Sequence, residues 1–220
     1  MSAGRGDGSR PRKLGILGGS FNPIHNGHLA MADAARAAHG LDRVLFVPAG
    51  RPPHKGADLA PAEDRLEMVR LALEGREGLE PSAIEVARPG TSYTYTVDTL
   101  EELRRLHPEA ELFFILGEDS IPELPGWRSA PRILELARIV AVNRAGSRAH
   151  FREGDFPGVA PEVIARLEAD RVTMPPAPEE SRRIREALRR GESVEGQVPL
   201  PVAQYIEKRG LYGRGSKMRG

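Results

Sequence analysis

The sequence predicts an α/β fold in which a parallel β-sheet is covered on both faces by helices. Short apolar runs alternate along the chain with segments of helical spacing, the order typical of βαβ units. The apolar runs are continuous and lack the polar alternation of half-exposed strands, so both sides of each strand should be buried. This pattern is typical of a doubly wound, Rossmann-like sheet, in which ligands bind beyond the carboxyl ends of the strands.

The first two units are expected before residue 74. Residues 14–17 form an apolar run that ends in Gly18-Gly19, which suits a buried strand followed by a tight turn. The alanine-rich residues 27–38 predict a helix. Residues 44–47 predict a second strand, with a proline-rich loop after it, and residues 62–73 have the apolar spacing of a second helix.

The following units continue this order. Residues 84–87 are expected to form a third strand, followed by a loop rich in Thr and Tyr and a helix over residues 97–106. Residues 112–116 predict a fourth strand and residues 139–142 a fifth, with a helix around Ile133 between them.

The last third of the chain is less regular. It predicts a short strand near Val172, a strongly basic helix over residues 179–190 and a final helix over residues 202–208. These helices would form a small C-terminal helical segment beside the sheet.

One domain over residues 13–212 is expected, since 220 residues suit a single domain with a sizeable core. Residues 1–12 are rich in Gly, Ser, Arg and Pro without an apolar stretch, so we expect a flexible extension and no signal peptide. Residues 213–220 are expected to form a flexible tail.

Composition narrows the classes of function. Because 32 Lys and Arg balance 31 Asp and Glu, the formal net charge of +1 predicts no general attraction to nucleic acid or to an anionic membrane. No stretch approaches the roughly 20 apolar residues of a membrane-spanning helix. The chain has no cysteine, which excludes disulfides and thiolate chemistry. We therefore expect a soluble, cytoplasmic protein whose anion sites are local.

The segment between the first expected strand and the first helix carries the chemistry. Gly18 and Gly19 let the backbone approach a phosphate closely, and the helix that follows offers N–H groups at the positive end of its dipole. His25 and His28 lie where this helix begins, and imidazoles there can stabilise negative charge on a phosphoryl group. Two histidines without a third ligand nearby disfavour a structural zinc site.

Two common nucleotide motifs are absent from this first unit. It contains neither Gly-x-x-x-x-Gly-Lys-[Ser/Thr] nor Gly-x-Gly-x-x-Gly, so kinase and dehydrogenase functions lose their main support.

Residues 19–29 read Gly-Ser-Phe-Asn-Pro-Ile-His-Asn-Gly-His-Leu, which resembles the signature of the bacterial nicotinate mononucleotide adenylyltransferases, within the His-x-Gly-His nucleotidyltransferase superfamily. Further segments resemble this family in the same order: residues 52–55, 95–100, 117–120, Trp127 and 198–212. The resemblance implies a nucleotidyltransferase domain over residues 13–212. It also implies a reaction of ATP with nicotinate mononucleotide, assisted by Mg²⁺, that yields nicotinate adenine dinucleotide and pyrophosphate in NAD biosynthesis.

The same resemblance implies roles for individual residues. The residues expected to act in catalysis are His25, His28 and Lys55. The residues expected to bind ATP are Gly18, Gly19, Ser20, Phe21, Asp119, Ser181, Arg182 and Arg185. The residues expected to bind the mononucleotide are Asn22, Thr94, Tyr95, Thr96, Trp127 and Arg144. No residue is assigned to a metal site.

Several of these residues have a structural alternative. Lys55 could be a solvated loop lysine, Asp119 could be a helix N-cap, and Trp127 could serve packing alone. The doubled Tyr-Thr pattern of residues 93–96 leaves open whether Thr94 or Thr96 contacts the nicotinate carboxylate.

The late basic helix departs from the family pattern. Where the family carries Ile-Ser-Ser-Thr-x-x-Arg, residues 179–185 read Glu-Glu-Ser-Arg-Arg-Ile-Arg. Acidic side chains near a triphosphate repel it unless Mg²⁺ or arginines compensate. Three outcomes stay open: the arginines bind phosphate instead, the loop is displaced until substrate arrives, or activity is weakened. A helix that starts with acids and continues with bases also suits the macrodipole without any functional role.

Other functions compete with this interpretation. Within enzymes, the chain could be an adenylyltransferase for nicotinamide mononucleotide or phosphopantetheine, although Trp127 and the Thr/Tyr loop favour a pyridine nucleotide. From another class, it could be a nucleotide-binding regulator that has lost catalysis. Binding of nucleic acid by the basic helix is disfavoured because acids are interspersed along it. The sequence is compatible with a homo-oligomer and does not specify one.

Overall fold

The computed structural model describes residues 11–52, 59–88, 93–144, 154 and 159–213. Most of the expected flexible ends, residues 1–10 and 214–220, therefore lie outside the described residues.

The described strands form one six-stranded sheet in which every neighbouring pair is parallel. They are β1 (Lys13–Gly19), β2 (Arg43–Pro48), β3 (Leu79–Pro81), β4 (Glu111–Gly117), β5 (Arg138–Arg144) and β6 (Val172–Met174). Their spatial order is β3-β2-β1-β4-β5-β6, so the direction of winding reverses between β1 and β4. Doubly wound sheets bind ligands at this switch point.

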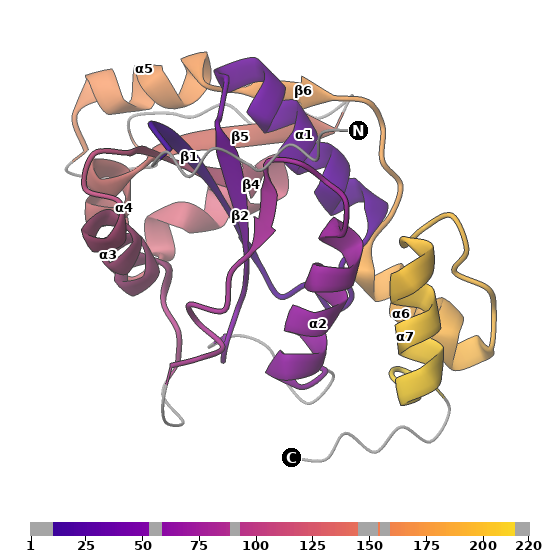
Figure 1. The fold of residues 1–220 in the computed structure, drawn as a ribbon. Coiled ribbons are helices and arrows are strands. Elements are labelled where there is room, and N and C mark those ends of the chain that lie inside the picture. The colour runs from indigo at the N-terminus through magenta and orange to yellow at the C-terminus, as the bar shows by residue number, and fades with distance from the viewer. Residues whose placement is uncertain (1–10, 53–58, 89–92, 145–153, 155–158, 214–220) are drawn as a thin grey trace, which may run out of the picture.

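Helices cover both faces of this sheet (Figure 1). They are α1 (Asn26–His39), α2 (Ala62–Leu73), α3 (Thr96–Leu106), the 3₁₀ segment η1 (Glu118–Gly126), α4 (Ala130–Leu136), α5 (Pro161–Ala169), α6 (Ser181–Arg190) and α7 (Leu200–Arg209). Buried residues of α1, α2, α6 and α7 share one apolar cluster, and those of α3, η1, α4 and α5 share the other. The predicted α/β class and its C-terminal helical segment are confirmed.

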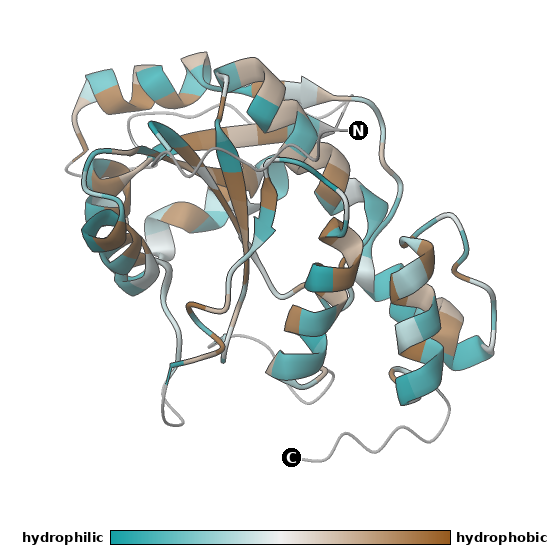
Figure 2. Ribbon diagram, viewed as in Figure 1, coloured by the Kyte–Doolittle hydropathy of each residue, from teal (hydrophilic) through white to brown (hydrophobic). Residues whose placement is uncertain are grey.

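The central strands divide their side chains between these two clusters. In β4, Phe113 and Ile115 belong to the first cluster, whereas Leu112, Phe114 and Leu116 belong to the second. Successive side chains of a strand point to opposite faces, so a strand covered on both sides must be apolar throughout. Figure 2 shows this as hydrophobic colour along the strands at the centre of the molecule.

The third strand differs from the prediction. Residues 84–87 form a turn in which the N–H of Ala87 donates to the carbonyl of Ala83 at 2.8 Å, and the strand lies earlier, at Leu79–Pro81. The apolar side chain of Ile84 packs against the second cluster from this turn. The prediction of a strand over residues 84–87 is therefore wrong, because Ile84 serves packing outside the sheet.

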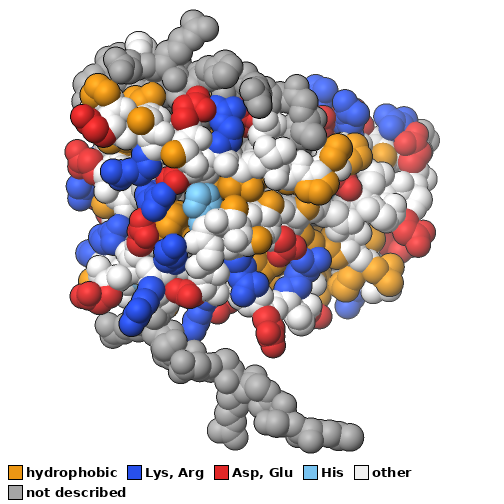
Figure 3. Space-filling view, turned by 90° about the horizontal axis from the view of Figure 1, so that it is seen from above, with side chains coloured by type: hydrophobic (Ala, Val, Ile, Leu, Met, Phe, Trp, Pro, Cys, Tyr) orange, Lys and Arg blue, Asp and Glu red, His pale blue; other side chains and the backbone are white. Residues whose placement is uncertain are grey.

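Charges are mixed on the molecular surface. On the face drawn in Figure 3, acidic and basic side chains are interspersed, which agrees with the net charge of +1. None of the helices in the described part of the chain has the length and apolar character needed to cross a membrane.

Candidate active site

The loop between β1 and α1 lies at the switch point of the sheet. β1 brings Gly18 and Gly19 to its carboxyl end, and α1 begins at Asn26, with His25 as its N-cap. The backbone of His25 is extended, with φ of −146° and ψ of 170°. Nδ1 of His28 accepts a hydrogen bond from the N–H of His25 at 3.3 Å. The first turn of α1 is thus fixed by the same histidines that the sequence singles out.

The imidazoles of His25 and His28 lie against each other. Their ring centroids are 3.7 Å apart, and the rings are tilted by 32°. His25 is buried, whereas His28 is half-buried and also meets the edge of Phe21 at 5.0 Å between centroids. Because Nδ1 of His28 accepts a hydrogen bond, the neutral ring carries its proton on Nε2, which is then a donor. His28 is therefore the ring better placed to reach a ligand.

The start of α6 is fastened to this loop. The hydroxyl of Ser181 donates to the carbonyl of Pro23 at 3.0 Å, and the guanidinium of Arg185 donates to the carbonyl of Asn22 at 2.8 Å. Both side chains were expected to bind ATP, and in this structure they hold the backbone of the β1–α1 loop. Arg182, the third expected ATP ligand of this helix, is exposed and reaches Glu186 at 3.8 Å.

Glu179 brings a carboxylate close to the histidine pair. A Cβ atom added to Gly27 would lie 3.1 Å from Nδ1 of His25 and 3.5 Å from Oε2 of Glu179, so both groups border the same small space. Glu180, by contrast, forms an ion pair with the exposed Arg183 at 3.4 Å. Of the two unexpected acids, Glu179 is therefore the one beside the imidazoles.

Asn22 contributes to the structure of the loop. Its side chain is buried, and its Oδ1 accepts hydrogen bonds from the hydroxyl of Tyr212 at 2.7 Å and from the N–H of Ala60 at 3.0 Å. Burial raises the pKa of Tyr212 above its ordinary range, so its hydroxyl stays a donor. Asn22 was expected to bind the mononucleotide, and its amide oxygen is engaged inside the protein.

Arg65 of α2 is a residue that sequence reasoning missed. Its side chain is 1% exposed, and its guanidinium donates to the carbonyls of Ser20 at 2.9 Å, Gly50 at 3.1 Å and Ala60 at 2.9 Å. Desolvation by burial lowers the pKa of Arg65. The sequence pattern places it only within a helix of apolar spacing.

A cavity of about 320 Å³ opens at the carboxyl edge of the sheet between β1 and β4. Its walls combine the glycine turn (Gly18, Gly19, Ser20) with Thr94, Thr96 and Trp127. Glu85 also lines it, and its two carboxylate oxygens accept from the hydroxyl of Thr99 at 2.7 Å and the N–H of Gly50 at 3.2 Å. His25 and His28 do not line this cavity; they lie at the start of α1, and His28 contacts Phe21, whose ring would lie 3.4 Å from a Cβ atom added to Gly19. The structure therefore brings the glycine turn and the tryptophan into one site.

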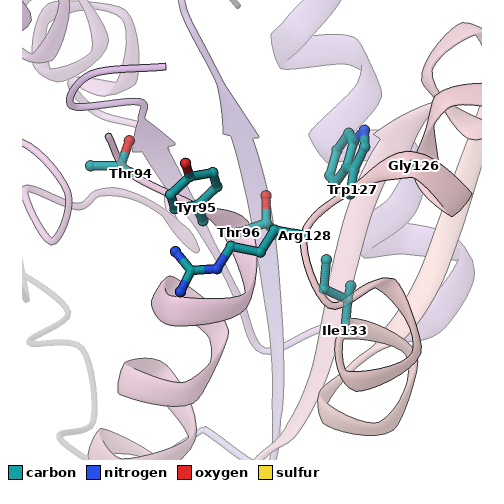
Figure 4. Close-up of a pocket in the computed structure, with 7 residues that line it drawn as sticks. All are labelled: Thr94, Tyr95, Thr96, Gly126, Trp127, Arg128 and Ile133. Carbon is teal, nitrogen blue, oxygen red and sulfur yellow. The ribbon is translucent and has the colours of Figure 1, made fainter. Parts of the chain in front are cut away.

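A smaller cavity of about 150 Å³ adjoins Trp127 (Figure 4). Trp127 is half-buried and meets Phe114 edge to face, with centroids 6.2 Å apart. Figure 4 shows Thr94 and Tyr95 across the cavity from Trp127. Arg128, which sequence reasoning also missed, lays its guanidinium over the ring of Tyr95 at 4.6 Å from the centroid.

Burial separates the two threonines of the Thr/Tyr loop. Thr94 is 9% exposed, and its hydroxyl oxygen has no hydrogen-bond partner among the described residues. Thr96 is half-buried and is the first residue of α3. A buried hydroxyl without a protein partner is costly, and a ligand would remove that cost. This observation favours Thr94 as the contact.

Two of the remaining expected residues, Asp119 and Arg144, lie at the carboxyl ends of β4 and β5. Asp119 is exposed at the start of η1, and its carboxylate folds over Gly117, where a side chain would clash with it. Arg144 is the last residue of β5, and its side chain is outside the described residues, as is the whole of Lys55.

Comparisons with known proteins identify the family of this chain. The sequence profile of the cytidylyltransferase-like family matches residues 16–187. A protein of Thermus thermophilus named "Probable nicotinate-nucleotide adenylyltransferase" is 44% identical over 200 residues, which cover 91% of this chain and 99% of the relative. A protein of the same name from Roseiflexus is 43% identical over 208 residues, covering 90% and 97%.

A solved structure shares the fold. The nicotinic acid mononucleotide adenylyltransferase of Plasmodium falciparum, complexed with NaAD, superposes with a TM-score of 0.71 at 17% identity and covers 91% of this chain and 97% of its own. The family resemblance inferred from the motifs is thereby confirmed. The chain belongs to the cytidylyltransferase-like family and, within it, to the nicotinate-nucleotide adenylyltransferases.

Proposed function

We propose that this enzyme transfers the adenylyl group of ATP to nicotinate mononucleotide, producing nicotinate adenine dinucleotide and pyrophosphate in NAD biosynthesis. The observation that carries this proposal is the 320 Å³ cavity, which joins a glycine turn to a tryptophan and a buried threonine. One end suits phosphates, and the other suits a flat, electron-poor ring. The loop that continues from the glycine turn carries two imidazoles in contact with each other. Relatives at 43% and 44% identity that carry the name of this activity support it.

The pyridine ring would bind between Trp127 and the Thr/Tyr loop. A half-buried indole offers a flat face for stacking. The hydroxyl of Thr94 would donate to the nicotinate carboxylate, with backbone N–H groups near Tyr95 as further donors. Arg128 adds a positive charge at the smaller cavity, which favours an acid over the neutral amide. These groups support nicotinate mononucleotide over nicotinamide mononucleotide and phosphopantetheine.

The phosphates would lie along the glycine turn and the start of α1. Backbone N–H groups there face the anion together with the positive end of the helix dipole. A phosphate oxygen of the mononucleotide attacks the α-phosphorus of ATP, the new P–O bond forms as the bond to pyrophosphate breaks, and no covalent enzyme intermediate is needed. Nε2–H of His28 would donate to the oxygen on which negative charge grows. His25 would support that ring from behind.

Mg²⁺ would neutralise part of the triphosphate charge when it is bound. Within the described residues, no group of three or more His, Asp or Glu side chains could form a dedicated metal cage. Mg²⁺ commonly keeps several waters and binds through substrate phosphates with few protein ligands. The site fits an ion that arrives on ATP, and the protein's own groups then position the nucleotide.

The expected ATP ligands of α6 would act in two ways. Ser181 and Arg185 hold the β1–α1 loop, so their effect on ATP would pass through the backbone that they fix. Arg182 is exposed and only distantly paired, so it can rotate toward a bound phosphate. Lys55 and Asp119 remain proposed contacts to phosphate and ribose, and Arg144 to the mononucleotide.

A pyrophosphate-release assay tests this proposal. The protein is supplied with ATP and Mg²⁺ together with nicotinate mononucleotide, nicotinamide mononucleotide or phosphopantetheine in separate reactions. We expect turnover with the nicotinate compound and at least a roughly tenfold lower kcat/KM with the other two, on the order of one lost charged contact. Turnover led by another acceptor would replace the substrate assignment. Tight ATP binding without pyrophosphate release from any acceptor would instead indicate a regulator.

A further inference from the structure

A buried cation lies behind the glycine turn. Arg65 is the largest of the side chains less than 2% exposed, and it extends from α2 toward the carboxyl edge of the sheet. It forms no ion pair with a carboxylate among the described residues, and its three hydrogen bonds all go to backbone carbonyls. Buried guanidinium groups are usually paired, because an uncompensated charge in the interior is costly.

The three carbonyls belong to different parts of the chain. Ser20 follows β1, Gly50 follows β2, and Ala60 precedes α2. Ser20 lines the 320 Å³ cavity, and so do Ala49 and Pro52 of the loop that contains Gly50. The planar fork of one guanidinium therefore joins two walls of the cavity, a geometry that a lysine ammonium cannot reproduce.

The guanidinium of Arg65 lies close to the glycine turn. Its Nη1 atom reaches the carbonyl of Ser20, within the turn that would bind phosphate. Glu63 and Glu85 are the acids whose fields act on it, and Glu85 is engaged by Thr99 and the N–H of Gly50. A polyanion bound on the other side of the turn would supply the missing negative charge.

We propose that Arg65 is a positioning residue for the phosphates of ATP: it holds the glycine turn in its binding shape, and its buried charge attracts the triphosphate through that turn. This proposal rests on the proposed function, which makes ATP a substrate of this site. Its binding measurement needs only that the protein binds ATP. The proposed function and the proposed role of Arg65 can therefore be refuted separately.

The chain offers a matched control in Arg104 of α3. This guanidinium also donates to two backbone carbonyls, those of Ala110 at 2.6 Å and Leu136 at 2.7 Å. These carbonyls precede β4 and β5, at the amino ends of the strands and opposite the cavity. Arg104→Met therefore removes a comparable clamp at the other edge of the same sheet.

The experiment compares Arg65→Met, Arg65→Lys and Arg104→Met in the full chain. For each, the dissociation constants of ATP and of adenosine are measured by calorimetry with Mg²⁺ present, and the melting temperature is measured without ligand. We expect Arg65→Met to weaken ATP binding at least tenfold and to leave adenosine within twofold. Arg65→Lys keeps the charge and should lose about threefold for ATP. Arg104→Met should melt lower with both affinities unchanged.

A purely structural role predicts a different result. If Arg65→Met weakens adenosine and ATP by the same factor, or leaves ATP binding within twofold, the proposal is overturned. Should Arg65→Met fail to fold, Arg65→Lys decides by the same ratio of the two affinities. If the unsubstituted protein binds ATP but shows no turnover, the proposed function is refuted. The comparison of ATP and adenosine affinities still tests the role of Arg65.

Discussion

Replacement of His28 by alanine tests the proposed chemistry most directly. The substitution removes Nε2 as a donor toward the reacting phosphates. It also removes the Nδ1 acceptor of the His25 N–H and the edge contact with Phe21. The first loss concerns catalysis, and the other two concern folding. Their magnitudes differ enough to be separated.

The cost in stability should be small. Loss of the bond that caps the first turn of α1 costs about 1 kcal/mol, part of which the better helix propensity of alanine offsets. For a chain of this size, about 1 kcal/mol corresponds to a decrease of roughly 2–4 °C in melting temperature. The variant should therefore remain folded at room temperature.

The cost in turnover should be large. Removing one preorganised donor to a developing oxyanion lowers kcat by about 100-fold or more, which corresponds to about 2.7 kcal/mol of transition-state stabilisation. Initial rates of pyrophosphate release at saturating ATP and nicotinate mononucleotide measure this. Thermal unfolding followed by circular dichroism measures the accompanying change in stability.

His39 supplies the control at the other end of the same helix. Its Nε2 lies 3.1 Å from the carbonyl of Asp170, and its ring packs on Phe113 with centroids 5.5 Å apart. His39→Ala should lower the melting temperature and leave kcat unchanged. If His28→Ala keeps kcat within threefold of the unsubstituted enzyme, the donor role of this imidazole is refuted.

The site and its surroundings support four further predictions. Trp127→Ala should raise the KM for nicotinate mononucleotide about tenfold, measured by pyrophosphate release, with the KM for ATP unchanged, because the stacking surface is lost. Thr94→Val should lower the preference for the nicotinate over the nicotinamide compound about tenfold, since a buried donor to a carboxylate is removed. Glu179→Gln should lower the KM for ATP about threefold, because one negative charge leaves the neighbourhood of the triphosphate. Burial and the bond to Asp64 raise the pKa of Tyr205 to about 12 from an ordinary value of 10.0. The free energy of unfolding, measured by urea titration, should therefore exceed that of Tyr205→Phe by a full and constant amount below about pH 10. This difference should decline as the pH rises toward about 12.

Each of the first three predictions has its own control. Trp127→Phe keeps a flat ring and should recover most of the affinity. Thr96→Val should leave the preference for the nicotinate compound unchanged. An equal loss of preference in Thr96→Val would mean that Thr96 contacts the nicotinate carboxylate. Glu192→Gln, which removes an exposed carboxylate paired with Arg190 beyond the far end of the same helix, should not change the KM for ATP. A higher KM in Glu179→Gln would mean that this carboxylate assists His25.

The alkaline prediction for Tyr205 depends on its partner. Its hydroxyl donates to Oδ1 of Asp64 at 2.7 Å, and Arg209 reaches the same oxygen at 3.0 Å. Ionised Tyr205 would face that carboxylate, which is why the neutral form is favoured in the folded state. A stability difference that stays constant between about pH 10 and about pH 12 would contradict this reasoning.

The buried strands are the part of the fold that could be predicted best from the sequence. Residues 112–116 are apolar without interruption because helices cover both sides of β4, and no turn or surface segment needs such a run. β3 has only three residues and ends in Pro81, so neither length nor periodicity marks it. Helix α5 (Pro161–Ala169) is absent from the sequence prediction, because only Ile164 and Leu167 are buried along it.

The candidate site could be predicted where its residues are neighbours in sequence. His25 and His28 stand out because three positions separate them at the start of a helix. Arg65 could not be found this way, because its partners are backbone carbonyls, which every residue possesses. The interior role of Asn22 depends on Tyr212, and no local pattern connects the two.

The bond between Tyr212 and Asn22 spans 190 positions of the chain. On a ribosome that adds about 5–20 residues per second, roughly 10–40 s pass between the synthesis of Asn22 and that of Tyr212. The last described strand of the sheet ends at Met174, so all described strands are synthesised well before Tyr212, which binds Asn22 of the β1–α1 loop. A growing polypeptide can therefore complete its sheet before Tyr212 fixes the side chain of Asn22, and activity should appear only after Tyr212 has joined the chain.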